Sequence, residues 1–189
     1  MQLSAQRHLP TDVETSWKLL NDPAFLKDCI RGCESIERIS DTDWRLAMAV
    51  RIGPVAARFS GRLTLGDLQP PTAYTLSFEG QGGAAGFGKG SAKVRLSPAG
   101  SGSLLDYTVN AEVGGKLAQI GSRLVDAAAR KMAEDFFSAF DAKATEHARQ
   151  VHAAAPGGLP RPIETKRPWL LPAALGVAGL LVVVVLSIA

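Results

Sequence analysis

Hydrophobic and polar residues alternate with a period of two along residues 34–113. In each run the large apolar residues fall on one side, and mainly arginine, serine and threonine occupy the other. Turn pairs at Gly53-Pro54 and Pro70-Pro71 interrupt the alternation. This pattern is typical of antiparallel strands that pack one face on a core and leave the other in water. We therefore predict a meander of about six strands.

A strand and two short helices are predicted ahead of this meander. The strand covers residues 3–7. Thr11 and Glu14 have the spacing of a capping box, in which the threonine hydroxyl accepts a hydrogen bond from the Glu14 amide and the Glu14 side chain reaches back. Asp22 followed by Pro23 starts the second helix, because aspartate is a good N-cap and proline suits the first helical position.

A long helix is predicted after the meander, from Lys116 to about Ala148. Gly114-Gly115 ends the last strand just before it. Apolar residues recur mostly at every fourth position, which gives the helix a broad apolar face that can lie across a curved sheet. The members of this row are Leu117, Ile120, Leu124, Ala128, Met132, Phe136 and Phe140.

Residues 168–189 contain no charged side chain. A helix needs about 20 apolar residues to cross the core of a bilayer, so we predict a C-terminal transmembrane helix here. The positive-inside rule then predicts a single-pass protein of the inner membrane, with its folded domain on the cytoplasmic side. The residues predicted to lie at the membrane interface are Arg161, Lys166, Arg167 and Trp169.

The chain then divides into a folded domain over 1–148, a tether containing Pro and Gly over 149–167, and a membrane anchor over 168–189. The net charge of +3 arises wholly after residue 148, because residues 1–148 contain 17 Lys and Arg and 17 Asp and Glu. The domain therefore lacks the excess of positive charge that nucleic-acid binding requires. Cys29 and Cys33 have no second Cys or His pair nearby, so free thiols are expected and a metal site is not.

Two segments resemble a known family. They read LPTDVETSWKLLNDPAFLKDCIRGCES and VGGKLAQIGSRLVDAAARKMAEDFFSAF, and they are similar to the CoxG subunit of carbon monoxide dehydrogenase. The order of elements also resembles the helix-grip fold of the START and Bet v 1 (SRPBCC) superfamily. The resemblance covers residues 1 to about 145. It implies an α+β fold in which a curved antiparallel sheet of about seven strands grips the long helix, to which the transmembrane helix is added.

Small and large residues share the inward register of the predicted sheet, which leaves space wherever the small ones fall. From the residues alone, a ligand cavity and a solid interior with glycine-permitted curvature both stay open. The resemblance to a lipid-binding fold favours the cavity, and the glycines around 80–90 and at Gly114-Gly115 are then its predicted moving parts. The predicted lining residues are Trp44, Leu46, Met48, Phe59, Gly61, Leu63, Phe78, Ala92, Tyr107, Leu117, Leu124, Met132 and Phe136.

Motifs for catalysis or nucleotide binding are weak. A GxGxxA match over 80–85 precedes a strand, whereas a dinucleotide site needs a helix N-terminus at that point. No inward strand position carries an Asp, Glu, His or Lys that could act as a buried acid or base. Arg45 is expected to face Arg62 across the Gly53-Pro54 hairpin, with an acid such as Asp43 or Glu79 nearby.

The function expected from these features is non-enzymatic, without a cofactor or metal. The resemblance implies an accessory protein of an aerobic carbon monoxide dehydrogenase or related molybdenum hydroxylase, which it recruits to the membrane. The apolar interior implies a membrane-derived small molecule as ligand, and a quinone is the leading candidate because the electrons of such an enzyme must reach a lipid-soluble acceptor. A docking scaffold with a filled core and a cyclase- or hydrolase-like enzyme of the same fold are the alternatives.

Overall fold

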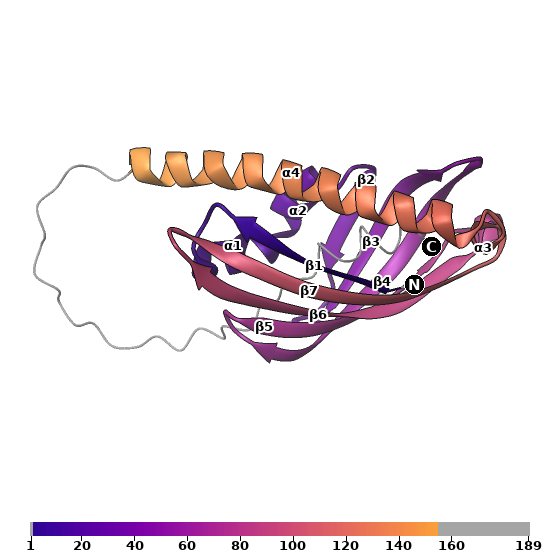
Figure 1. The fold of residues 1–189 in the computed structure, drawn as a ribbon, viewed down its shortest axis with the longest axis horizontal. Coiled ribbons are helices and arrows are strands. Elements are labelled where there is room, and N and C mark those ends of the chain that lie inside the picture. Colours follow the sequence, from indigo (N-terminus) through magenta and orange to yellow (C-terminus); the bar gives the residue numbers. More distant parts are fainter. Residues whose placement is uncertain (1, 155–189) are drawn as a thin grey trace, which may run out of the picture.

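The alternating segments form one seven-stranded antiparallel sheet that curls around a long helix (Figure 1). The computed structural model describes residues 2–154. The strand order is β1-β7-β6-β5-β4-β3-β2, so β1 and β2 are the two edges. The elements are β1 (Gln2–Leu9), α1 (Val13–Leu20), α2 (Pro23–Cys29), β2 (Cys33–Arg38), β3 (Asp43–Ile52), β4 (Val55–Gln69), β5 (Ala73–Gln81), the 3₁₀ turn η1 (Gly83–Ala85), β6 (Phe87–Ala99), β7 (Gly102–Gly114), α3 (Lys116–Gln119) and α4 (Ser122–Ala154).

The predicted strands and short helices are present, but the predicted capping box of α1 is wrong. Asp12 is the N-cap, and its carboxylate accepts hydrogen bonds from the amide and the hydroxyl of Thr15. Thr11 is instead buried, and its hydroxyl lies 2.7 Å from that of Ser16, which in turn lies 2.8 Å from the hydroxyl of Ser103. The Thr11 side chain therefore joins the start of α1 to the start of β7.

The predicted hairpin register is confirmed. Ile52 pairs with Val55 across the turn, and Arg45 lies opposite Arg62 on the outer face. Asp43 offsets the repulsion between the two arginines, because Arg62 Nη2 lies 2.7 Å from Asp43 Oδ1. Charged residues continue in register across six neighbouring strands and form an outer charge row of Glu37, Arg45, Arg62, Glu79, Lys89 and Glu112.

The long helical segment is interrupted where the sequence pattern predicts continuity. Gly121 has a φ of +93°, a left-handed conformation that glycine adopts without strain, and it separates α3 from α4. α4 then runs to Ala154, past the predicted end of the helix near Ala148. Its buried side chains recur at spacings of three or four and comprise Val125, Ala129, Ala133, Phe136, Phe137, Phe140 and Ala144.

The fold class needs one correction. No helix within residues 2–154 is long and apolar enough to cross a membrane, so the structure supports the seven-stranded α+β fold without a transmembrane helix. α4 has the length to cross, but charged residues punctuate it throughout. The anchor predicted over 168–189 and the interface residues Arg161, Lys166, Arg167 and Trp169 lie outside the described residues.

The predicted localisation as a single-pass inner-membrane protein falls with that helix, because no helix of the described chain could serve as the span. The prediction rested on the length and apolarity of one run of sequence. These properties do not by themselves make a segment into a helix.

Candidate functional site

The interior between the sheet and α4 gathers most of the residues predicted to line a cavity. Two predicted residues differ: Met132 is half-buried, and Leu124 is 52% exposed on the outside of α4. Leu124 is therefore not a lining residue. The others are buried in the interior, namely Trp44, Leu46, Met48, Phe59, Gly61, Leu63, Phe78, Ala92, Tyr107, Leu117 and Phe136.

Aromatic rings occupy much of the space that small inward residues leave. A Cβ added at Gly90 would lie 2.4 Å from the Phe78 ring, and one added at Gly82 would lie 2.2 Å from the Phe59 ring. The inward glycines thus accept neighbouring rings in this conformation.

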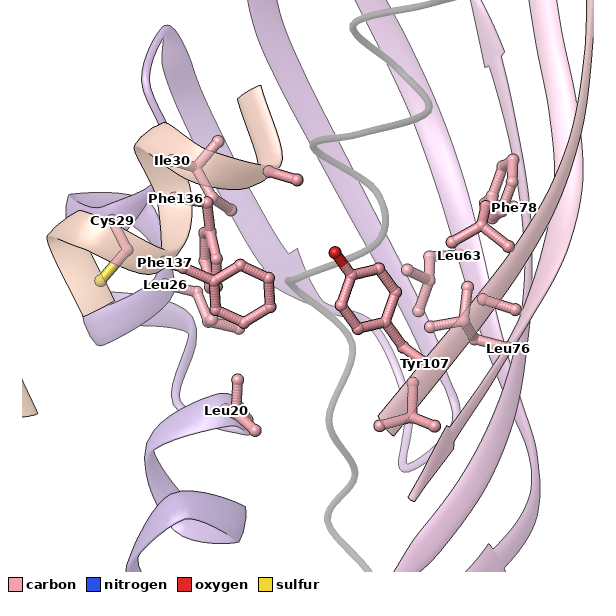
Figure 2. Packing of buried hydrophobic residues seen from close by; sticks show 14 of the residues in the cluster. Leu20, Leu26, Cys29, Ile30, Leu63, Leu76, Phe78, Tyr107, Phe136 and Phe137 are labelled. Atoms are coloured by element: carbon pink, nitrogen blue, oxygen red, sulfur yellow. The ribbon is translucent and has the colours of Figure 1, made fainter. Parts of the chain in front are cut away.

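Aromatic rings also fill the helical side of the interior. The Phe136 ring centroid is 5.5 Å from that of Phe137. Figure 2 shows these two rings of α4 facing Tyr107 and the apolar side chains of the sheet. Rings from α4 and from the sheet therefore meet in the space between the two layers.

Sequence reasoning missed the residues of α4 that lie deepest. Val125, Ala129, Ala133 and Phe137 are buried, one position beyond the predicted row at 124, 128, 132 and 136. The shift follows from the break at Gly121, which rotates α4 relative to the helical frame assumed from Lys116. The Phe136-Phe137 pair was the available signal, since two adjacent aromatic residues widen the apolar face by one position.

One end of the interior is closed by backbone packed against backbone. A Cβ added at Gly86 would lie 2.0 Å from the carbonyl oxygen of Gly114, and one at Gly115 would lie 2.5 Å from Gly86 Cα. Beside this contact Leu117 of α3 is fully buried. We call these three glycines the glycine contact. It joins the two segments that the sequence predicts to move.

Two polar groups of the interior have no hydrogen-bond partner among the described residues. They are Trp44 Nε1 and the Tyr74 hydroxyl, both from side chains that are at most 2% exposed. Burial raises the pKa of Tyr74 well above its ordinary value, so the hydroxyl stays protonated. A buried donor without a partner costs roughly 1–3 kcal/mol. A hydrogen-bond acceptor that entered the interior could remove part of this cost.

Two hollows differ in character. One of about 690 Å³ lies on the outer face of the sheet and is lined by polar side chains that include Thr64, Ser77 and Ser91. The other, of about 180 Å³, lies between β1 and α4, where the apolar interior reaches the surface. We call it the β1–α4 crevice, and its lining includes Leu3, Arg7, Tyr107, Arg130, Ala133 and Phe137.

The structure brings together no group of three or more His, Cys, Asp or Glu within residues 2–154 that could hold a metal ion. Burial raises the pKa of the Cys29 thiol to about 12, and it also raises the pKa of Cys33. Because the thiolate is the nucleophilic form, burial suppresses the reactivity of both cysteines.

Comparison with known families agrees with this architecture. The profile of the family described as the carbon monoxide dehydrogenase CoxG subunit matches residues 6–145. The chain belongs to the CoxG family. This membership associates the chain with carbon monoxide dehydrogenase. A search of curated proteins found no match.

Solved structures of similar shape include a conserved protein from Geobacillus kaustophilus. It is 31% identical to this chain with a TM-score of 0.73, and the match covers 77% of this chain and 96% of that one. A Thermus thermophilus protein, TTHA0849, is 16% identical with a TM-score of 0.59 over 78% of this chain and 99% of its own. The protein Ara h 8.0201 shares the fold at 16% identity and a TM-score of 0.55, over 77% and 98% of the two chains.

Proposed function

We propose that this CoxG-family chain is a non-catalytic accessory protein of an aerobic carbon monoxide dehydrogenase or a related molybdenum hydroxylase. We further propose that it binds an apolar small molecule, a quinone, between its sheet and α4. A hydroxylase that oxidises its substrate must pass the electrons to an acceptor. A quinone is an apolar acceptor of electrons, and the interior of this chain suits such a molecule.

The observation that carries the ligand proposal is an apolar interior that reaches the surface at the β1–α4 crevice. Leu3, Tyr107 and Phe137 belong to the buried core, yet each also lines the crevice. Small-molecule sites are commonly apolar concavities with a few convergent polar groups. Trp44 Nε1 supplies one further polar group inside, since it lacks a partner among the described residues.

A docking scaffold with a filled core is the second candidate. The contacts of the Phe78 ring at Gly90 and of the Phe59 ring at Gly82 favour it, because they leave no void at these two glycines. The two candidates differ in one property. A carrier must open its interior, whereas a scaffold works with the interior closed.

Titration of the full chain with a short-tailed quinone tests the proposal. Trp17 and Trp44 are buried in the core, so quenching of tryptophan fluorescence reports ligand in the interior, and calorimetry provides an independent measurement. We expect saturable binding at one site. Absence of binding to the folded protein, together with an intact complex with the hydroxylase, would replace the carrier by the scaffold.

A pair of variants localises the binding. Ala92→Phe adds a ring to the interior, because Ala92 is only 2% exposed, and Ser91→Phe adds the same ring to the exposed outer face one residue away. We expect Ala92→Phe to abolish quinone binding, at a stability cost of roughly 1–3 kcal/mol if neighbouring side chains must shift. Ser91→Phe should bind as the original chain does. Equal binding by both variants would place the ligand outside the interior.

A further inference from the structure

We propose that the β1–α4 crevice holds the carbonyl-bearing ring of the ligand, and that Tyr107 and Arg130 donate hydrogen bonds to its oxygen atoms. This inference rests on the proposed function, since it takes the ligand to be a neutral quinone. It adds the place where the polar end of that ligand is recognised, and the residues that recognise it.

The crevice forms because an edge strand and a helix meet there through side chains. Arg7 of β1 connects the two, with its Nη2 3.4 Å from Asp141 Oδ2 and its Cζ 5.4 Å from the centroid of the Phe137 ring. Ala133 is small, which leaves room beside Phe137. The volume of about 180 Å³ compares with the roughly 150 Å³ of an apolar cavity that admits benzene. The crevice is therefore large enough for a single ring.

Two hydrogen-bond donors in the crevice are available to a ligand. Tyr107 packs on Phe137 with a centroid distance of 5.7 Å, and its hydroxyl has no hydrogen-bond partner within residues 2–154. Figure 2 shows this hydroxyl pointing away from the sheet toward the helical side of the interior. Burial raises the pKa of Tyr107, partly opposed by Arg7 and Arg130, so the hydroxyl remains a donor. Arg130 forms no ion pair with a described residue.

The charges around the crevice favour a neutral ligand. Arg7 and Arg130 contribute two positive charges, while Glu134 in the lining and Asp141 beside Arg7 contribute two negative charges. An anionic ligand would meet no net positive charge, in contrast to sites for phosphates or carboxylates, where cations predominate. A quinone carbonyl is neutral and accepts hydrogen bonds, which matches donors held on an apolar surface. The Phe137 ring offers a face for a planar ligand.

A matched pair of probes tests this site in the full chain. Duroquinone and durene are methyl-substituted single rings of similar shape, but only duroquinone has carbonyl oxygens. Affinities are measured by calorimetry for the original chain, for Tyr107→Phe and Arg130→Gln, and for Arg123→Gln as the control. Arg123 is an exposed arginine of the same helix that does not line the crevice. Arg130 is also exposed, so its variant should fold even if Tyr107→Phe does not.

We expect both crevice variants to bind duroquinone about fivefold more weakly, which is the effect of losing one hydrogen bond, and to bind durene unchanged. Arg123→Gln should match the original chain with both probes. Duroquinone binding that neither crevice variant weakens would overturn the crevice site and leave the proposed function standing. An equal loss of both probes would overturn the hydrogen-bonding role. Failure of the original chain to bind duroquinone or a longer-tailed quinone would overturn the proposed function itself.

Discussion

Phe136 and Leu124 of α4 offer a direct test of how the helix is seated on the sheet. Both belong to the apolar row predicted from sequence, but in the structure Phe136 is 1% exposed and Leu124 is 52% exposed. Substituting each by alanine, Phe136→Ala and Leu124→Ala, removes one large apolar side chain from the same helix. The two costs should differ strongly, because one side chain fills the core and the other lies half in water.

The expected magnitudes follow from these environments. A buried Phe→Ala change costs about 3–5 kcal/mol. Phe136 also loses ring contacts with Phe137 and Phe140, at centroid distances of 5.5 and 5.9 Å, and such pairs contribute about 0.5–1.5 kcal/mol each. The upper part of the range is therefore expected for Phe136→Ala. Full burial of a leucine stabilises by about 1.5–3 kcal/mol, so Leu124→Ala should cost about 1 kcal/mol or less.

Urea denaturation of the full chain, followed by far-UV circular dichroism, measures the free energy of unfolding of each variant. In thermal melts the same costs correspond to a fall in Tm of about 6–20 °C for Phe136→Ala and below about 4 °C for Leu124→Ala. Equal costs for the two variants, within about 1 kcal/mol, would refute the orientation of α4 and restore the continuous helical row predicted from sequence.

Two further predictions concern the sheet. Hydrogen bonds from Arg62, followed by those from Ser40 and Thr64, lower the pKa of Asp43 to about 2, so the stability that Asp43 contributes should be present above about pH 4 and lost as the pH falls toward 2. Asp43→Asn should thus be less stable than the original chain at pH 6, with the difference shrinking over that acid range in thermal melts; a constant difference would contradict the assignment. Gly90→Ala should cost about 1–3 kcal/mol in urea titrations, because its Cβ would overlap the Phe78 ring and a backbone oxygen, whereas Gly66→Ala on the outer face, near only the Thr75 hydroxyl, should cost less. Equal costs would show that the interior at Gly90 is empty.

Local features predicted most of the sheet. The period-two alternation placed β3 to β7, and the two-residue turn at Gly53-Pro54 was sufficient to pair Arg45 with Arg62. A hairpin with a short loop has its register determined by residues close in sequence, so no distant contact is needed to predict it. Asp22 and Pro23 predicted the start of α2 for the same reason.

Features that depend on distant contacts could not be predicted in this way. Thr11 and Asp12 are both capable N-caps, and the pairing of Thr11 with Ser16 and Ser103 leaves the role to Asp12. Ser103 is far from Thr11 in sequence and reaches it only when β7 is in place. The outward position of Leu124 likewise follows from Gly121, whose conformation depends on how α3 and α4 pack.

The sequence by itself determined the fold class of the described chain, the apolar character of its interior and its membership of the CoxG family, because periodicity and family-specific residues are properties of the linear chain. Only the tertiary structure decided which face of α4 is buried and where rings fill the positions of inward glycines. It also placed Arg7, Tyr107 and Arg130 around one crevice, although they come from β1, β7 and α4. Such convergence depends on the curl of the sheet around the helix, which no local pattern encodes.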